Sequence, residues 1–316
     1  MCGIVAYLGA AQAKTILLGG LARLEYRGYD SAGLAVMQQT VSGDGSLAVP
    51  VKAEPPSEAP SESSPTLSTK RRRVSGASGH RISVVKSAGK VSNLTNACSV
   101  ENSAGTLGIA HTRWATHGPP TDVNAHPHTS SDGSLAVVHN GIVENFTALR
   151  AELVRKGYVM RSDTDTELIV HLIDDVRKQQ WMPLEEAVRQ AMTQVHGAFG
   201  IAVMSADDPE LLIGARKGSP LILGIGEDEY ILASDAAAVI ERTKRVLYLQ
   251  VRRGAWSARM RVRRCRPRRA GWPTHARARA MHDSSTRASR CVRMRLHVGR
   301  RDGDHLAQCW LPDQDA

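Results

Sequence analysis

Apolar positions near the amino terminus follow two different periods. Residues Ile4–Leu8 form a short continuous apolar run that is typical of a buried strand. A helical period follows, with one face made by Ile16, Leu17, Leu21 and Leu24. Gly28 interrupts this helical pattern, and residues 32–37 form a second strand-like run. The chain is therefore expected to begin with a strand, a helix and another strand.

The middle and the end of the patterned region continue this mixture. Helices are predicted for Asn145–Lys156, with Gly157 as the C-terminal cap, for 165–180, and for a third segment after Pro183. Strand-like runs precede them in "TLGIAHTRWAT" and "SLAVVHNGIV", where His139–Gly141 is expected to form a turn. Four or five further strand candidates occupy 197–250. Strands that bracket helices favour a layered α+β fold.

Two segments break the apolar pattern. From about residue 38 to 89 the chain is rich in Pro, Ser, Glu and Lys, which predicts a disordered insertion; order is expected to resume with "RISVVKSAG". Residues 251–316 contain 17 Arg and 5 Asp but neither Lys nor Glu, a local charge of +12. Such a composition cannot build a core. We therefore predict one domain over 2–250, interrupted at about 38–89, and a disordered Arg-rich tail over 251–316.

Charge and cysteine content narrow the class of protein. The net charge of +10 belongs to the tail, because residues 1–250 carry about −2. The 5 cysteines are scattered without a CxxC pair, so neither a disulfide framework nor a metal site is expected. No apolar run approaches the roughly 20 residues that cross a bilayer, and no secretion signal precedes the first strand. A cytoplasmic protein without membrane contact is expected.

Cys2 is the first candidate for chemistry. A thiol has a pKa near ~8.5 and needs a base to become a good nucleophile at neutral pH. If Met1 is removed, the new α-amine of Cys2, with a pKa of about 7.7 to 8.0, lies beside the thiol and can accept its proton. One residue would then supply both the nucleophile and the base.

Several segments support this interpretation of Cys2. The chain contains "MCGIVAYLG", "RLEYRGYDSAGLAV", "HTRWATHG", "NAHPH", "HNGIVEN" and "SDTDTE" in this order. Together they resemble the glutaminase domain of the glutamine:fructose-6-phosphate amidotransferase family, over residues 1 to about 249 apart from the insertion. The resemblance implies a four-layer α/β/β/α N-terminal-nucleophile hydrolase fold, L-glutamine as substrate and no cofactor.

The resemblance also implies roles for individual residues. Cys2 would attack the side-chain amide of glutamine, and Asn140 and Gly141 would form the oxyanion hole. Arg113 would bind the α-carboxylate of glutamine and Asp165 its α-ammonium group. A second group would surround the substrate: Thr116, His117 and Gly118 in a glutamine-binding lid, Trp114 as the gate for ammonia, and Arg27 and Gly28 near the same pocket.

Two further features, the histidines of these motifs and a basic run before Ser75, also lead to predictions. A metal would leave Arg113 and Asp165 without a role, so the histidines of these motifs are not interpreted as ligands, and His126 is expected to be structural rather than a direct substrate contact. In "KRRRVS", Arg72 and Arg73 precede Ser75 with the spacing of a basophilic kinase substrate, which makes Ser75 a candidate phosphorylation site.

The resemblance ends before the two sugar-isomerase domains that the family places after the glutaminase. Fructose 6-phosphate is therefore an expected partner only if those domains are present. Assembly into a homo-oligomer is likewise expected only of the full-length protein, and this chain alone would act only as a glutaminase. The tail has the composition of a sequence translated in the wrong frame, so other frames of the DNA beyond residue 250 should encode isomerase-like sequence.

Alternative functions stay open at this stage. Another glutaminase of the same class, from the amidotransferase that begins purine synthesis or from asparagine synthetase, is one alternative. A protein that binds RNA through its Arg-rich tail is another, less favoured because the tail has few aromatic residues and no RGG or RS repeats. A catalytically inactive remnant is disfavoured because every expected pocket residue is present.

Overall fold

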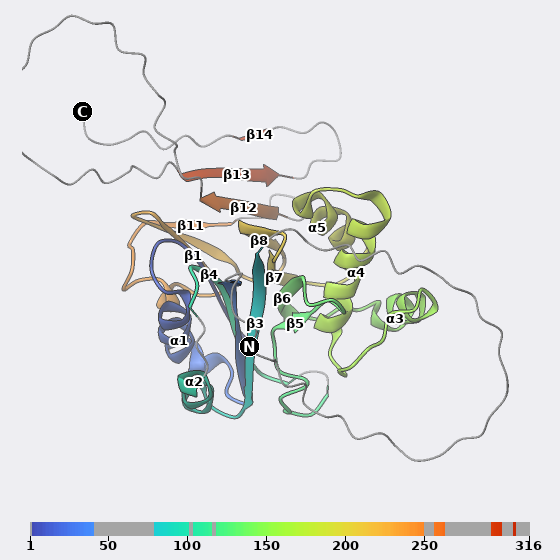
Figure 1. Cartoon of the computed structure of the whole chain (residues 1–316), viewed down its shortest axis with the longest axis horizontal. Helices are drawn as coiled ribbons and strands as arrows, with labels where there is room; N and C mark the ends of the chain where they lie inside the picture. Colours follow the sequence, from blue (N-terminus) through green and yellow to red (C-terminus); the bar gives the residue numbers. More distant parts are fainter. Residues whose placement is uncertain are drawn as a thin grey trace, which may run out of the picture.

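The computed structural model describes residues 2–40, 79–100, 104–115 and 118–249, together with the strand residues 256–262, 292–298 and 306–307. Two seven-stranded sheets dominate the described part of the chain. Helices lie on the outer face of each sheet (Figure 1). The α+β class predicted from the sequence is confirmed.

The first sheet contains the amino-terminal strand of the chain. Its order is β11-β9-β10-β1-β4-β2-β3. The strands are β1 (Gly3–Leu8), β2 (Ser31–Gln39), β3 (His80–Ala88), β4 (Leu107–Arg113), β9 (Ile222–Gly226), β10 (Glu229–Ala233) and β11 (Val246–Tyr248). β1 is central and pairs antiparallel with β4 and β10. The end of the chain that carries Cys2 is therefore anchored between two strands.

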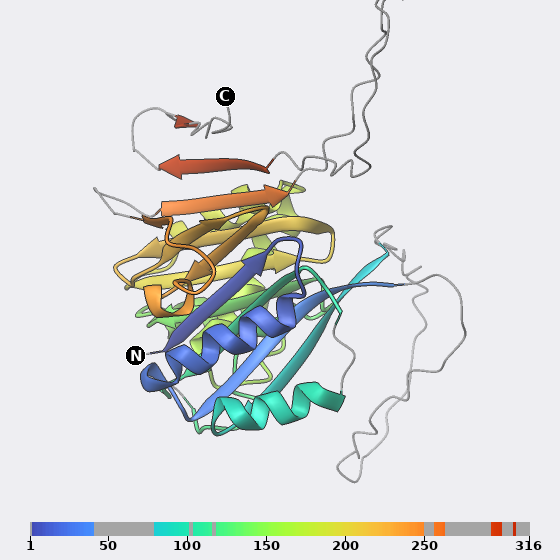
Figure 2. The same ribbon diagram turned by 90° about the vertical axis from the view of Figure 1, so that its left-hand side faces the viewer.

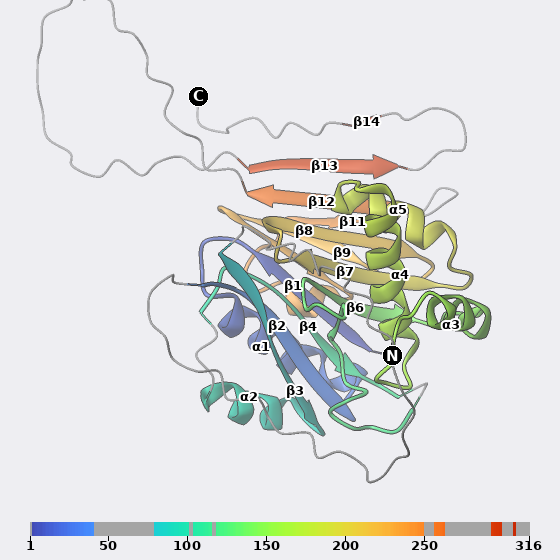
Figure 3. The ribbon, with the colours of Figure 1, turned by 45° about the vertical axis from the view of Figure 1, so that its right-hand side comes forward.

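The second sheet has the order β14-β13-β12-β8-β7-β6-β5. Its strands are β5 (His128–Thr129), β6 (Leu135–Gly141), β7 (Phe199–Ser205), β8 (Asp208–Lys217), β12 (Trp256–Val262), β13 (Val292–Val298) and β14 (Leu306–Ala307). Figure 3 shows these strands crossing those of the first sheet at an angle. The two sheets pack face to face.

Alternation along the strands builds three apolar layers. Ile4, Ala6 and Leu8 of β1 face the second sheet, where they meet β6 and β7 residues such as Val138. The intervening Val5 and Tyr7 face the opposite way, toward two helices. These helices, α1 (Ala13–Leu24) and α2 (Val91–Val100), lie side by side across the first sheet in Figure 2.

The second sheet is covered by the other three helices. They are α3 (Phe146–Arg155), α4 (Asp165–Gln180) and α5 (Leu184–Thr193), and they share a buried cluster with β6, β7 and β8. The four layers are therefore helices, sheet, sheet and helices, as the family resemblance implied. The predicted bounds of the first two helices agree with the structure within one residue, and the third begins directly after Pro183 as predicted. Gly157 follows α3 with a φ of 90°.

Several sequence predictions need correction. His139–Gly141 is not a turn, because β6 continues to Gly141 and pairs with β7 through the register Gly141↔Phe199. The segment assigned to an insertion at about 38–89 includes the end of β2 and, in the part where order was expected to resume, all of β3; residues 41–78, including Ser75, lie outside the described residues. In the segment expected to be a disordered tail, β12 pairs with β8.

Two short 3-10 helices complete the elements near the site. They are η1 (Glu25–Arg27), which follows α1, and η2 (Ala236–Ala238), which follows β10. Within the described residues, no helix is both long and apolar enough to cross a bilayer.

Candidate functional site

A cavity of about 310 Å³ lies where the two sheets meet, next to the start of β1. Its volume is at the lower end of the range for small-molecule sites. The lining includes most of the residues selected from the sequence: Cys2, Arg27, Arg113, Trp114, His126, Asn140, Gly141 and Asp165. These residues come from at least four elements, so only the folded chain brings them together.

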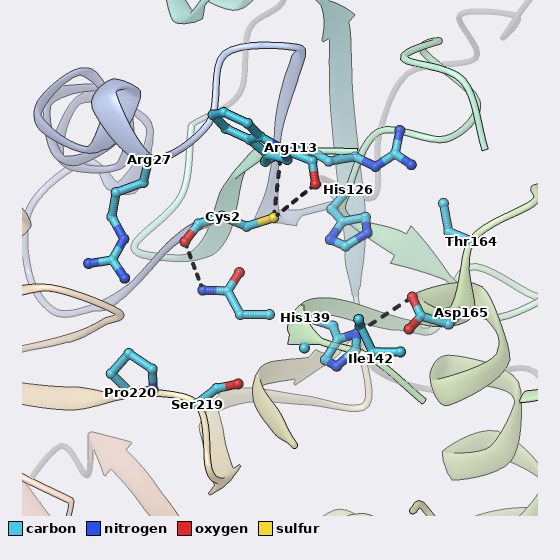
Figure 4. Close-up of a pocket in the computed structure, with 13 residues that line it drawn as sticks. Cys2, Arg27, Arg113, His126, His139, Ile142, Thr164, Asp165, Ser219 and Pro220 are labelled. Carbon is cyan, nitrogen blue, oxygen red and sulfur yellow. Dashed lines mark hydrogen bonds and ion pairs between the residues drawn. The ribbon is translucent and has the colours of Figure 1, made fainter. Parts of the chain in front are cut away.

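The thiol of Cys2 forms one side of the cavity (Figure 4). Its Sγ accepts the backbone N–H of Trp114 at 3.2 Å and lies 3.5 Å from the carbonyl oxygen of the same residue. Burial raises the pKa of the Cys2 thiol, while the N–H of Trp114 acts in the opposite direction. Since burial has the larger effect, this thiol needs a base to become a nucleophile at neutral pH.

Asn140 and Gly141, the last residues of β6, lie beside Cys2. The Asn140 Nδ2 donates to the carbonyl oxygen of Cys2 at 3.0 Å, and its Oδ1 lies 2.9 Å from Nε2 of His111. Gly141 has a φ of 143°, and a Cβ at this position would lie 2.0 Å from the carbonyl oxygen of Ala198. Only glycine therefore fits at residue 141.

We expect Gly141→Ala to be strongly destabilising, because the new methyl group meets backbone atoms in a conformation that L-residues avoid. The free energy of unfolding should fall by at least about 2 kcal/mol. Gly133→Ala is the matched control, because Gly133 also has a positive φ, 72°, but a Cβ there meets nothing within 4 Å. It should cost about 1 kcal/mol. Urea unfolding measures the free energy of unfolding of both variants. Equal losses of stability in the two would contradict this account.

Arg113 and Asp165 lie across the cavity from Cys2 in Figure 4. The Arg113 side chain is 3% exposed and donates to the carbonyl oxygens of Pro119 at 3.2 Å and Gly118 at 3.1 Å. Asp165 is the first residue of α4, and its Oδ2 accepts the N–H of Val143 at 3.0 Å. A guanidinium and a carboxylate on one wall suit a zwitterionic α-amino acid, because each can pair with one of its two charges.

Other residues selected from the sequence have indirect contacts. Gly28 does not line the cavity; it packs against the backbone of Arg113, where a Cβ would lie 2.8 Å from two atoms. Gly118 also contacts Arg113 rather than the cavity. Arg27 does line the cavity, but its guanidinium pairs with Asp235 at 2.5 Å. Thr116 and His117 lie outside the described residues.

Asp30 was not identified from the sequence, although it lies within the motif "EYRGYDSAG". Its carboxylate accepts the N–H of Ala115 and the hydroxyl of Ser31, and its own N–H donates to the carbonyl oxygen of Arg113 at 3.2 Å. These bonds fix the chain on both sides of Trp114. They thereby position the N–H group that faces the Cys2 thiol.

The remaining lining residues were also not selected as site residues: His139, Ile142, Thr164, Ser219 and Pro220. His139 is buried, with Nδ1 3.8 Å from Asp165 and 3.2 Å from the hydroxyl of Thr166. Ser219 and Pro220 come from the connection between β8 and β9, far along the chain from β6. Nothing in their local sequence indicates that they reach this cavity.

Three buried histidines, His111, His126 and His128, lie close together, and His126 also lines the cavity. The ring centroids of His111 and His126 are 4.1 Å apart, and those of His126 and His128 are 5.2 Å apart. Burial lowers the pKa of His111 to about 3 and lowers those of His126 and His128 in the same direction. All three are therefore neutral at physiological pH. No group of His, Cys, Asp and Glu residues in the described part of the chain could hold a metal ion.

We expect these histidines to make the protein acid-sensitive. A histidine whose pKa is lower in the folded state binds a proton mainly in the unfolded state below pH ~6.5, so stability is lost as the pH falls from there. The loss is on the order of 1.4 kcal/mol per histidine and pH unit. Urea unfolding at pH 6.5 and 5.0 measures it. The difference should shrink in His126→Gln but not in the exposed control His196→Gln; equal stability at both pH values would contradict the prediction.

Comparison with known proteins shows that part of this chain is similar to a known domain family. Residues 111–241, which include Arg113, Asn140, Gly141 and Asp165, match the family described as a glutamine amidotransferase domain. These residues are therefore similar to a glutamine amidotransferase domain. Cys2 lies outside the matched range, but it lines the same cavity as Arg113, Asn140 and Asp165.

Curated relatives extend the similarity toward the amino terminus. The chain is 45% identical over 253 residues to glutamine--fructose-6-phosphate aminotransferase [isomerizing] from Chlorobaculum tepidum, and 46% identical over 251 residues to the protein of the same name from Pseudomonas putida. Each alignment covers 79% of this chain but 34% of the relative. The chain thus matches about a third of the length of these relatives.

Solved structures support the fold of the amidotransferase domain. The glutamine phosphoribosylpyrophosphate amidotransferase from B. subtilis aligns with a TM-score of 0.59 and 23% identity, over 82% of this chain and 47% of that chain. A structure described as the allosteric regulatory enzyme of purine biosynthesis gives the same values. This likeness supports the four-layer α+β fold that the resemblance implied.

Proposed function

We propose that the domain hydrolyses L-glutamine to glutamate and ammonia with Cys2 as the nucleophile. The observation that carries this proposal is the placement of the Cys2 thiol on one side of the cavity and of Arg113 and Asp165 on the other, with the Asn140 amide hydrogen-bonded to Cys2. A glutamine whose α-groups pair with Arg113 and Asp165 directs its side-chain amide toward Sγ. Substrate orientation of this kind supplies much of the rate enhancement of enzymes.

The first step forms a bond between Sγ of Cys2 and the amide carbon of glutamine. After removal of Met1, the α-amine of Cys2 takes the thiol proton, and the carbonyl oxygen becomes an oxyanion. The Asn140 Nδ2 and the backbone N–H of Gly141 donate to that oxygen. The carbon–nitrogen bond then breaks, and the amine returns its proton to the departing ammonia. A thioester remains on Cys2.

Water completes the reaction. It attacks the thioester carbon while the α-amine accepts one of its protons, and the carbon–sulfur bond breaks to release glutamate and restore the thiol. Each cycle consumes one glutamine and one water and releases one glutamate and one ammonia. Neither a metal nor a cofactor is needed for this balance. Trp114, which lines the cavity and is half-exposed, is our candidate for the gate through which ammonia leaves.

The acceptor of the ammonia is a second part of the proposal. The curated relatives from Chlorobaculum tepidum and Pseudomonas putida are named for fructose 6-phosphate, and "EYRGYDSAG" with "RWATHG" resembles that family more than its purine or asparagine counterparts. We therefore infer that ammonia is destined for fructose 6-phosphate in a cytoplasmic, homo-oligomeric full-length protein, whereas the domain over residues 2–250 acts as the glutaminase. RNA binding by the Arg-rich tail is the less favoured alternative.

Substrate analogues test the glutaminase proposal without altering the protein. Ammonia release from L-glutamine is compared with ammonia release from N-acetylglutamine, which lacks the α-ammonium group, and from glutaminamide, which lacks the α-carboxylate. Loss of one charged hydrogen-bonding group should lower kcat/KM by about 10- to 100-fold in each case. Equal turnover of all three compounds, or no glutamate from glutamine, would sink the proposal.

A further inference from the structure

The orientation of the Asn140 amide is fixed by its two neighbours. A backbone carbonyl oxygen can only accept a hydrogen bond, so the amide atom that lies 3.0 Å from the carbonyl oxygen of Cys2 must be the NH₂ group. The other amide atom, Oδ1, then lies 2.9 Å from Nε2 of His111. Because an amide oxygen is also only an acceptor, Nε2 of His111 must carry the proton.

His111 is held rigidly enough to define that orientation. It is 0% exposed on β4, which is hydrogen-bonded to β1 on one side and β2 on the other. The His126 ring packs on its face with an interplanar angle of 31°. Burial keeps the pKa of His111 at about 3, so the ring remains neutral with one N–H group throughout the physiological range.

Packing alone does not account for a histidine at position 111. Among the described residues, the bond to Asn140 is the side-chain to side-chain hydrogen bond of this histidine, and the backbone of His139 also interacts with the ring. A phenylalanine or leucine would fill the same space, but it would leave Oδ1 of Asn140 without a donor. A histidine at this position is therefore explained by Asn140 rather than by packing.

We propose that His111 is a positioning residue for glutamine hydrolysis, which holds the Asn140 amide so that its second N–H points at the oxyanion. The inference rests on the proposed function, because it assigns the orientation of a group within that site. Without the His111 donor, Oδ1 of Asn140 is buried and unpaired, and the amide is retained only by its bond to Cys2. Rotation of the amide would then replace a donor with an acceptor where negative charge develops.

Matched variants separate positioning from packing. His111→Phe keeps a flat ring beneath His126 but removes the donor, and His111→Leu is a second donor-free variant in case the first does not fold. His111→Gln restores an N–H group near the place of Nε2. The control is His171→Phe, because His171 is also buried but lies on α4 outside the cavity. Initial rates of glutamate release give kcat and KM for each.

We expect the donor-free variants to lower kcat by about 10- to 100-fold with KM changed less than about 3-fold, since removal of a whole oxyanion donor costs about 10²- to 10³-fold. His111→Gln should recover most of kcat, and His171→Phe should retain it. In the Asn140→Ala background, His111→Phe or His111→Leu should cause no further loss, because there is no amide left to orient.

Several results would overturn the inference. An unchanged kcat in a folded donor-free variant, a loss expressed only in KM, or a full additional loss in the Asn140→Ala background would each show that His111 does not act through Asn140. Failure of both donor-free variants to fold, with His111→Gln folded but no more than 10% as active as the wild type, would do the same. An inactive wild-type chain would instead refute the proposed glutaminase function.

Discussion

Replacement of Cys2 by alanine is expected to lower glutamate release by on the order of 10⁴-fold or more, because no other thiol of the described chain lines the cavity. Glutamine should still bind, because Arg113 and Asp165 are unchanged. The assay is steady-state release of glutamate by the purified variant, combined with a calorimetric Kd for glutamine.

Cys98 provides the matched control for that substitution. Cys98 is a residue of α2, is 1% exposed and belongs to the apolar cluster between the first sheet and its helices. Cys98→Ala removes a sulfur atom of the same kind at a distance from the cavity, so kcat should remain within about 2-fold of the wild-type value. Activity that survives in Cys2→Ala, or that disappears in Cys98→Ala, would contradict the assignment of the nucleophile.

Asn140→Ala is expected to have the next largest effect. The variant loses the Nδ2 donor beside Cys2, and loss of one oxyanion donor lowers kcat by about 10²- to 10³-fold. KM should change little, because Asn140 does not contact the α-groups of the proposed substrate pose. Steady-state kinetics of glutamate release separate the two constants.

A surface asparagine controls for general effects of this substitution. Asn93 is exposed on α2, and Asn93→Ala should leave kcat unchanged. If Asn140→Ala raised KM while kcat stayed constant, Asn140 would be a substrate-binding residue rather than part of an oxyanion hole. The thermal midpoint of each variant checks that the fold is retained.

Strong periodic patterns in the sequence were sufficient for most of the fold. Strand β1 and the helices α3 to α5 have clear apolar patterns, so the sequence predicts their type and their approximate bounds. Helix α2 was missed because "VSNLTNACSV" contains residues with low helix propensity. It forms because Val91, Leu94 and Cys98, spaced three and four residues apart, pack against the first sheet.

The end of β6 shows where local chemistry misleads. An Asn-Gly pair between apolar runs is typical of a hairpin turn, and the sequence predicted one at His139–Gly141. The pairing of β6 with β7 extends the strand through Gly141. At this position the carbonyl oxygen of Ala198 occupies the space that a Cβ would take. Gly141 is required for close backbone packing rather than for a turn.

The candidate site was predictable only in part. Motif resemblance pointed to Cys2, Arg113, Asn140 and Asp165, which the structure brings to one cavity. The contacts that orient them were not predictable, because Asp30 meets Ala115 across 85 positions and Arg27 meets Asp235 across 208. Such pairs depend on sheet order and register, which no local pattern contains.

The comparison that tests the central claim most directly is between two forms of the same chain. One begins at Cys2 after enzymatic removal of Met1, and the other retains Met1, so that the nitrogen of Cys2 is an amide and cannot act as a base. Mass spectrometry confirms each terminus, and glutamate release is then measured for both. We predict that the Met1-free form hydrolyses glutamine and that the Met1-retaining form is slower by at least about 10²-fold, since a general base contributes 10²- to 10⁴-fold. Equal rates would contradict the claim that the Cys2 α-amine is the base.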